Sequence, residues 1–289
     1  MYLSRVNVRP QLSASDLSLF RENRDGYGLH QLFWTLFSDG KSESDCQKKR
    51  EFLFREEVAS EQRQTSEGRK LDPVYYLVSK EQPRADSSLF NVQTKVYAPK
   101  LSAGDQFAFT LRANPVVTRA GKRHDIVMDA QQKWLKEQLS ALNLGLAGSK
   151  GELKKRLLDF ANDQCLEHWC ELIGRGIFPE KLEQKLSRSE TLEWAIKTVV
   201  DGAVLQWFER QAEQFGFLVV RNSGGKPVLE SGAYRRAHLM GKRKKVSFNA
   251  LDLSGEIEIV APLNFEKMLF SGIGPAKAFG CGLMLLRRI

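Results

Sequence analysis

The alternation of apolar and polar residues divides the chain into a mixed first part, a helical middle and a mixed last part. Residues 2–8 alternate in the way that a half-buried strand requires. A polar linker follows, and then Leu29, Leu32 and Phe33 recur at helical spacing within residues 26–37. Further strand patterns lie at 52–54, 74–78, 90–97 and 107–113, with a charged loop over 56–72. This order predicts a ferredoxin-like half of the kind that RNA-recognition domains use.

The middle of the chain is helical in period from about residue 130 to residue 200. Ser149 and Glu152 have the spacing of a capping box, so a helix should begin at about Lys150. Ser187 and Glu190 repeat the signature before a second helix. We therefore expect an all-helical module over residues 129–200.

After this module the mixed pattern returns. The expected elements are a helix at 203–214 stopped by Gly216, a strand at 217–220, two strands within 246–260 around a turn at 253–255, a helix at 263–270 and a strand at 283–286. These elements make a second ferredoxin-like half. The predicted fold is therefore α+β, with two tandem ferredoxin-like (RRM-like) domains and an all-helical insert in the second. The expected bounds are 1–105 for the first domain, 106–128 with 201–289 for the second, and 129–200 for the insert.

The charge balance favours a polyanionic partner. Lys and Arg number 44 against 35 Asp and Glu, a formal net charge of +9. No apolar run is long enough to cross a bilayer, and residues 1–10 lack the pattern of a signal peptide. The four cysteines form no CxxC pair, as expected for reduced thiols in a cytoplasmic protein without a membrane partner.

The basic run over residues 235–245 is the strongest candidate for contacts to a phosphate backbone. It carries no acid, and Arg112 extends it from an earlier strand. The alternative is a solvated hairpin. The cations of the run are Arg235, Arg236, Lys242, Arg243, Lys244 and Lys245.

His30 is the histidine whose context favours chemistry, because Tyr27 lies one helical turn before it. An imidazole titrates near neutrality and transfers protons, and a nearby phenol orients it or a scissile phosphate. RNA carries its own nucleophile, the 2′-hydroxyl, so one histidine with basic groups suffices to cut it. The alternative is a histidine at a helix end that bonds a carbonyl group.

A glycine-rich run, residues 272–283, includes Lys277 and allows close backbone approach to a phosphate or to another strand. It matches neither a P-loop nor a dinucleotide fingerprint. Cys165, His168 and Cys170 lie close in sequence but do not face one way on a helix. We therefore expect no metal site and no cofactor.

Five segments together resemble the CasE family of CRISPR repeat endoribonucleases, the type I-E Cascade subunit. They are MYLS, GLHQLFWTLF, EFLF, LRANP and GIGPAKAFGCGL, and they occur in the family's order across residues 1–127 and 201–289. The resemblance implies two tandem ferredoxin-like domains that cut a CRISPR repeat RNA hairpin without metal. The product carries a 2′,3′-cyclic phosphate, and the protein stays on the crRNA beside other Cascade subunits.

The same resemblance assigns roles to residues. His30 matches the family's catalytic histidine and Tyr27 its supporting tyrosine, while the basic run lies where the second domain grips the hairpin stem. Lys277 lies in the family's glycine-rich loop. The alternative function is a non-catalytic subunit that binds the crRNA hairpin.

The insert departs from this family and resembles a SAP motif, a helix-turn-helix module usually associated with DNA binding. Its segment LSALNLGLAGSKGELKKRLLDF carries the resemblance. The alternatives are a helical spacer or a contact surface for another Cascade subunit. The candidate contacts to duplex DNA are Lys150, Lys154, Lys155 and Arg156.

Overall fold

The computed structural model describes residues 1–23, 27–37, 52–57, 73–240 and 245–289. Its contacts divide the chain into two compact units. The first comprises Met1–Asn114, Phe215–Phe217 and Gly232–Ile289, and the second comprises Pro115–Gln214 and Leu218–Ser231. The domain bounds expected from the sequence stay a prediction.

The first half of unit 1 has one four-stranded antiparallel sheet with the strand order β2-β3-β1-β4. This is the order of a ferredoxin-like sheet, although residues 80–89, between β3 and β4, contain no helix. Its elements are β1 (Tyr2–Val8), α1 (Ala14–Asn23), α2 (Tyr27–Trp34), β2 (Phe52–Glu57), β3 (Val74–Ser79) and β4 (Phe90–Val96).

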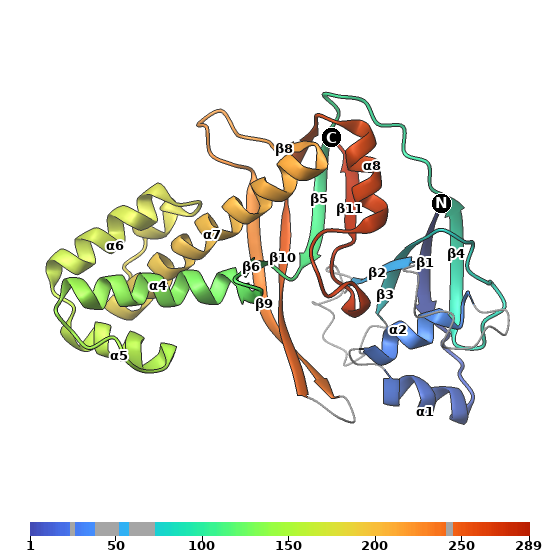
Figure 1. Cartoon of the computed structure of the whole chain (residues 1–289), viewed down its shortest axis with the longest axis horizontal. Helices are drawn as coiled ribbons and strands as arrows, with labels where there is room; N and C mark the ends of the chain where they lie inside the picture. Colours follow the sequence, from blue (N-terminus) through green and yellow to red (C-terminus); the bar gives the residue numbers. More distant parts are fainter. Residues whose placement is uncertain (24–26, 38–51, 58–72, 241–244) are drawn as a thin grey trace. The chain divides into compact units, whose positions relative to one another are not determined.

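The second sheet repeats this order as β11-β5-β10-β8, with β9 added beside β10 (Figure 1). In chain order, one helix follows the first strand and another follows the third, as in the ferredoxin-like arrangement. The predicted α+β fold is therefore confirmed. The elements are β5 (Gln106–Ala113), β8 (Phe217–Val219), β9 (Leu229–Met240), β10 (Lys245–Ile259), α8 (Pro262–Ser271), the short helix η3 (Lys277–Phe279) and β11 (Met284–Arg288).

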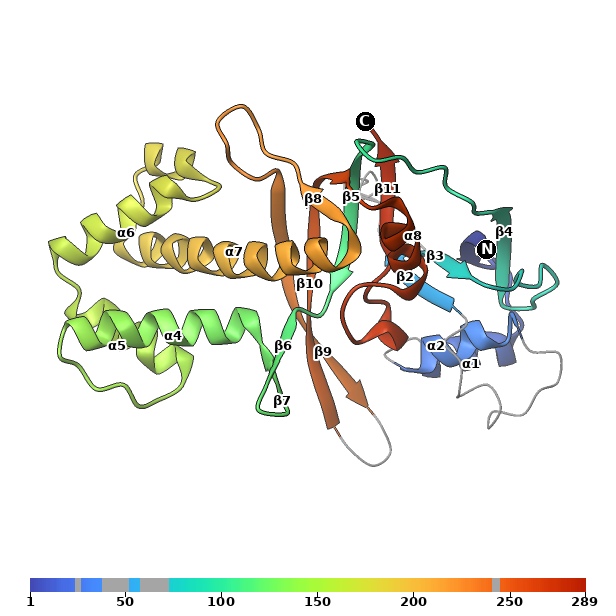
Figure 2. The same ribbon diagram turned by 45° about the horizontal axis from the view of Figure 1, so that its top comes forward.

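Unit 2 contains the predicted helical module. Both expected capping boxes are present: Ser149 and Glu152 cap α5, and Ser187 and Glu190 exchange the same bonds at the start of α7. Helices α4 and α7 lie side by side in both views (Figures 1 and 2). The elements are β6 (Val116–Arg119), β7 (Lys122–Asp125), α4 (Ile126–Ala141), α5 (Lys150–Phe160), α6 (Asp163–Arg175), the short helix η2 (Pro179–Glu183) and α7 (Arg188–Phe215).

Two expectations about helices are wrong. The segment expected as a polar linker contains α1, which buries only Phe20 and begins where Ser13 accepts a bond from the Asp16 amide. So narrow an apolar contact leaves little periodicity in the sequence. The helices expected to end at residue 200 and to begin at residue 203 are one helix, α7, because Gly202 lies within it and the helix ends before Gly216.

Two expectations about strands also need correction. The turn expected at 253–255 is absent, because Gly255 pairs with Phe109 of β5 and β10 runs unbroken for 15 residues. The β6–β7 hairpin was not expected at all. Its residues are polar or half-buried, so hydrophobic alternation is missing from them.

The first sheet buries side chains on both faces. Phe52 and Phe54 of β2 join the larger core with α2, whereas Leu53, between them, packs with Val78 and Leu283 in a second cluster. Alternation along a strand sends neighbours to opposite faces. Strand β2 is therefore covered on both sides, and this places its aromatic rings beside α2.

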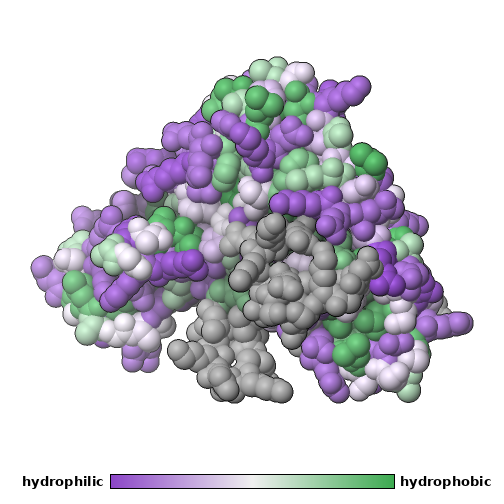
Figure 3. Space-filling view, turned by 45° about the vertical axis from the view of Figure 1, so that its right-hand side comes forward, coloured by the Kyte–Doolittle hydropathy of each residue, from purple (hydrophilic) through white to green (hydrophobic). Residues whose placement is uncertain are grey.

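Large exposed apolar side chains belong to separate elements, such as Val96 of β4, Phe160 of α5 and Leu263 of α8. On the face shown in Figure 3, the described side chains form small apolar patches among polar ones. Across the part of the chain that the structure describes, no helix is long and apolar enough to span a bilayer.

Candidate active site

His30 lies in the middle of α2, and the close approach of α1 fixes this helix. A Cβ atom at Gly28 would lie 2.8 Å from the Cα atom of Asn23, so only glycine fits there without a shift. Buried Leu29, Leu32 and Phe33 anchor α2 in the core. The helix therefore presents His30 in a fixed orientation.

Aromatic rings surround the His30 imidazole. The centroid of Phe52 lies 4.8 Å from it and that of Phe54 lies 6.1 Å away. Burial among these rings lowers the pKa of His30 from 6.5 to about 4, because a low-polarity environment disfavours the cation. The imidazole is therefore neutral at neutral pH.

The hydrogen bonds of His30 define its resting state. Trp34, one turn along α2, donates its indole N–H to Nε2 of His30 over 3.1 Å. An accepting Nε2 in a neutral ring puts the proton on Nδ1, and Nδ1 is buried without a hydrogen-bond partner among the described residues. The alternative interpretation was a hydrogen bond from His30 to a carbonyl group. Neither ring nitrogen makes such a bond among the described residues. Proton exchange with a ligand requires the Trp34 bond to break or the ring to turn.

Tyr27 lies beside this imidazole at the surface. Its ring centroid is 5.5 Å from that of His30 and 6.2 Å from that of Phe279, and the side chain is 42% exposed. The structure therefore brings the two predicted catalytic side chains together, with the phenol open to solvent.

The glycine-rich run passes close to β2 and α2. A Cβ atom at Gly282 would lie 2.8 Å from the carbonyl oxygen of Ile273, and one at Gly280 would lie 3.2 Å from the ring of Phe54. Both glycines have positive φ. The run thus makes the expected close approach to a strand, and a contact with a phosphate stays a prediction. The approach places Phe279 of η3 against Tyr27.

A hollow of about 360 Å³ lies against β2, and Leu53, Val78 and Phe270 of the second cluster line it. Phe52, whose ring packs against His30, also belongs to its lining. Lys80, Lys267 and Lys277 line the hollow, and none of the described residues in its lining is acidic. Lys277 was expected from the sequence. Lys80 and Lys267 were missed, because they are isolated in the sequence and only the fold brings them together.

Arg112 is held in an ion pair. Its Nε donates to one carboxylate oxygen of Asp252 over 2.8 Å and its Nη2 to the other over 3.2 Å, and its side chain is 18% exposed. Arg55 is buried nearby and pairs with Glu57. The RNA contact expected for Arg112 stays a prediction, since an RNA phosphate would have to compete with Asp252.

The basic run belongs to two strands. Arg235 and Arg236 are in β9, and Lys245 begins β10. The side chains of these three residues lie outside the description, as do Lys242, Arg243 and Lys244 altogether. Their expected contacts to RNA therefore stay predictions.

Three of the four cations expected to contact DNA are engaged within the insert. Lys150 donates to the amide oxygen of Gln131, and Lys154 pairs with both carboxylate oxygens of Glu193. Arg156 donates to the carbonyl oxygens of Gly145 and Ala147. Lys155 is exposed. The DNA contact stays a prediction, although these bonds also explain the cations as parts of the insert's fold.

Metal-binding side chains do not gather in the part of the chain that the structure describes, where no three of His, Cys, Asp and Glu could hold an ion together. Cys165 and Cys170 of α6 are free thiols there. Cys281, at the end of the glycine-rich run, is buried, and burial raises the pKa of its thiol to about 12.

The chain has two ferredoxin-like halves, and His30 packs among aromatic rings in the first. These features define a tandem ferredoxin-like protein. The chain belongs to the family described as CRISPR associated protein, which matches residues 1–168 and 175–288. The resemblance found in the sequence is thus confirmed at the level of the family. Among curated proteins, none matches the sequence.

Solved structures of the same fold include CRISPR endoribonucleases. A structure of the CRISPR endoribonuclease Cse3 bound to 19 nt RNA has a TM-score of 0.57 at 19% identity, over 99% of this chain and 100% of that one. Cse3 of Thermus thermophilus, bound to an RNA representing a pre-cleavage complex, has a TM-score of 0.56 at 19% identity, over 99% and 98%. The CRISPR-associated protein Cas6e of Escherichia coli str. K-12 has a TM-score of 0.50 at 20% identity over both full chains.

Proposed function

We propose that this protein is a metal-independent endoribonuclease that cuts CRISPR repeat RNA at a hairpin and stays bound to the crRNA in a Cascade complex. The observation that carries the proposal is the His30 imidazole, held among aromatic rings beside exposed Tyr27. Membership of the CRISPR associated protein family and the shared fold with RNA-bound Cse3 support it.

The proposed reaction is attack by the 2′-hydroxyl of the RNA on the adjacent phosphate. The 2′-oxygen forms a bond to phosphorus, the bond to the 5′-oxygen of the next nucleotide breaks, and the products are a 2′,3′-cyclic phosphate and a 5′-hydroxyl. One proton leaves the 2′-hydroxyl and one reaches the 5′-oxygen, so an acid–base group with an accessible neutral form is required. His30 supplies such a group.

The substrate itself changes the charge state of His30. A phosphodiester brought beside the ring favours the cation, so binding raises the pKa of His30 from its low value. We infer that Lys80, Lys267 and Lys277, which line the hollow against β2, stabilise charge on the phosphate. Tyr27 is proposed to orient the imidazole or the phosphate.

The proposed partners are the repeat RNA hairpin and other Cascade subunits, without a cofactor. Relatives support this, since a chain of a structure described as a CRISPR RNA-guided surveillance complex has a TM-score of 0.50 and 16% identity to this chain. The RNA contacts proposed for Arg112 and for the run from Arg235 to Lys245 would lie along the hairpin stem.

The test is cleavage of the repeat RNA from the adjoining CRISPR array, with excess EDTA and analysis of the new ends. We expect a single cut at the base of the hairpin and a 2′,3′-cyclic phosphate. Replacing His30 with Ala should slow cutting by about 10²–10⁴-fold and leave hairpin affinity nearly unchanged. A dependence on divalent metal, or full activity of H30A, would refute the proposed mechanism.

The alternative is a non-catalytic subunit that binds the hairpin. It predicts tight binding of the repeat RNA with no cutting at any pH, and replacement of His30 would then change nothing but stability. Replacing Lys80 and Lys267 with Gln separates the two functions further. If the enzyme proposal holds, this variant should lose cleavage rate in addition to affinity.

A further inference from the structure

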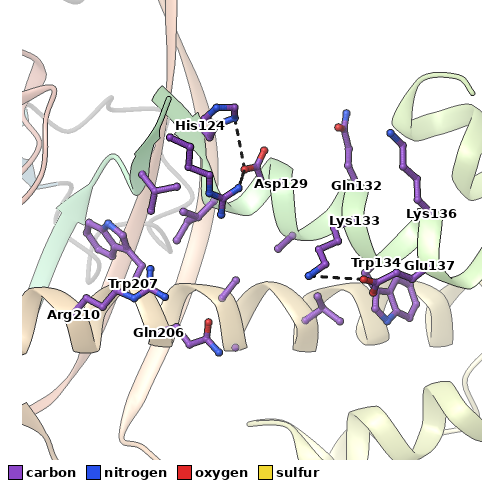
Figure 4. Close-up of a pocket in the computed structure, with 17 residues that line it drawn as sticks. His124, Asp129, Gln132, Lys133, Trp134, Lys136, Glu137, Gln206, Trp207 and Arg210 are labelled. Carbon is purple, nitrogen blue, oxygen red and sulfur yellow. Dashed lines mark hydrogen bonds and ion pairs between the residues drawn. The ribbon is translucent and has the colours of Figure 1, made fainter. Parts of the chain in front are cut away.

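A groove in unit 2 is lined by none of the residues of the candidate active site. It lies between α4 and α7, with the β6–β7 hairpin at one end, and has a volume of about 720 Å³ (Figure 4). All of its lining residues belong to residues 117–210. The groove is thus a property of unit 2 alone.

Basic side chains from three separate elements line this groove. Arg119 and His124 come from the hairpin, Lys133 and Lys136 from α4, and Arg210 from α7. Two acidic side chains, Asp129 and Glu137, accompany them, so the four Lys and Arg side chains leave a net charge of +2 with histidine neutral. In Figure 4 the amine of Lys133 points from α4 toward α7.

The two acids hold their partners weakly. The Arg119–Asp129 pair spans 3.0 Å, with its side chains 66% and 35% exposed. The Lys133–Glu137 pair spans 3.9 Å and is 80% and 56% exposed. Exposed ion pairs of this kind contribute little to stability, so an incoming anion can replace these carboxylates readily.

The shape of the groove suits an extended anion. Asp129, which holds Arg119, and Lys136 are seven positions apart on α4, which is about 10 Å along a helix axis. Adjacent phosphates of a duplex strand advance by about 3.4 Å along the axis, so the groove spans about three of them. A single small anion would contact only part of this row of cations.

The floor of the groove argues against recognition of bases. Trp134 and Trp207 are 7% and 4% exposed, so their ring faces are covered and cannot stack on bases. Gln132 and Gln206 add exposed amide donors at the walls. Lysine, arginine and amide side chains are the groups that contact phosphate oxygens in complexes with nucleic acids.

We propose that the groove between α4 and α7 binds the sugar–phosphate backbone of a nucleic acid, without reading its sequence. This site is distinct from the SAP-like face, where Lys150, Lys154 and Arg156 are engaged within the insert. It also does not depend on the proposed cleavage of RNA.

The experiment compares the full-length protein with a K133Q/R210Q variant on three probes that lack a hairpin. The probes are an oligo(U) RNA, an oligo(dT) DNA and a duplex DNA, each of about 20 nucleotides or base pairs. The affinity of each is measured as a function of salt concentration. Both replaced side chains are exposed, so the thermal unfolding midpoint should not change.

We expect the variant to bind at least one probe about tenfold more weakly, with a salt slope smaller by about two, one for each phosphate contact removed. The probe with the largest loss identifies RNA, single-stranded DNA or duplex DNA as the source of the backbone. The charge-conserving variant K133R/R210K should retain the original slope.

The matched control is K185Q/R188Q, which removes the same charge from other exposed positions of unit 2. It should bind all three probes nearly as the parent does. The proposal is overturned if K133Q/R210Q binds every probe with the parent's affinity and slope. It is equally overturned if the control loses as much, because binding would then follow the overall charge of unit 2.

Discussion

His30 is a titratable group kept neutral by its surroundings. Phe52 and Phe54 exclude water from one side of the ring, and Trp34 occupies the lone pair of Nε2. The sequence predicted His30 and Tyr27 from their spacing on a helix, and the structure brings them together. The role of Trp34 and the low pKa of His30 were not predictable, because β2 closes over the ring from another part of the chain.

The depressed pKa of His30 should make folding stability depend on pH. The pKa is about 4 in the folded protein and 6.5 in the unfolded chain, so the unfolded chain binds a proton first as the pH falls. The free energy of unfolding should therefore fall between about pH 6.5 and pH 4, by on the order of 2–3 kcal/mol from this residue.

Urea titrations at pH 7 and pH 4.5 measure this dependence, with H30N as the variant that cannot titrate. The difference between the two pH values should be smaller in H30N than in the parent. Equal pH dependence in both proteins would show that His30 titrates normally in the fold.

Removal of the indole N–H should raise the pKa of His30. A hydrogen bond to Nε2 favours the neutral ring, so W34F loses an effect that adds to burial. NMR titration of the His30 ring protons should show an increase toward 6.5. Under the proposed function, the acidic limb of the pH–rate profile should move up with it, and a profile unchanged despite a shifted titration would separate His30 from the chemistry.

At the scale of elements, the glycine-rich run shows what a sequence pattern can and cannot specify. Four glycines within residues 272–282 predicted a close backbone approach, but the partner stayed open between a phosphate and a strand. The structure shows contact with β2, through Gly280 at Phe54 and Gly272 at Leu53. Residues so far apart in sequence leave no local signal of their contact.

Alanine at Gly282 should disturb this approach. Its φ is +93° and a Cβ atom would lie 2.8 Å from the backbone oxygen of Ile273, so the G282A variant should lose about 1–3 kcal/mol of stability. Gly202 is the matched control, since it lies inside α7 with open space around it. There G202A should gain up to about 1 kcal/mol from helix propensity.

Chemical denaturation of the two variants and the parent makes the comparison. Loss of stability in G202A similar to that in G282A would mean that the close approach of the loop is not what requires glycine.

At the scale of the whole molecule, the strand order of one sheet repeats in the other, and this repeat was expected from the sequence. The expectation succeeded because each strand carries its own alternation or apolar run. The expectation failed at α1, because this helix buries only Phe20. It also failed at the turn expected within β10, because Gly255 pairs with Phe109 of β5. Such features depend on neighbours that a single segment does not encode.

The covered interior of unit 1 should protect one thiol. Cys281 is buried and its pKa is raised to about 12, so it carries almost no thiolate near neutral pH. Cys165 and Cys170 are half-buried. With iodoacetamide at pH 8, mass spectrometry should show alkylation of these two well before Cys281, and this order should vanish in urea. Early modification of native Cys281 would contradict the burial of its thiol.

The long stretch of sequence between β5 and β10 has a consequence for folding during synthesis. Tyr2 pairs with Val96 in the first sheet, so all four of its strands have left the ribosome once β4 has. Arg112 meets Asp252 across 140 positions, and the helical module is made in between. During that interval β5 has neither β10 nor β11 to pair with. The length of the insert therefore sets how long the apolar side chains of Phe107, Phe109 and Leu111 stay open to other nascent chains.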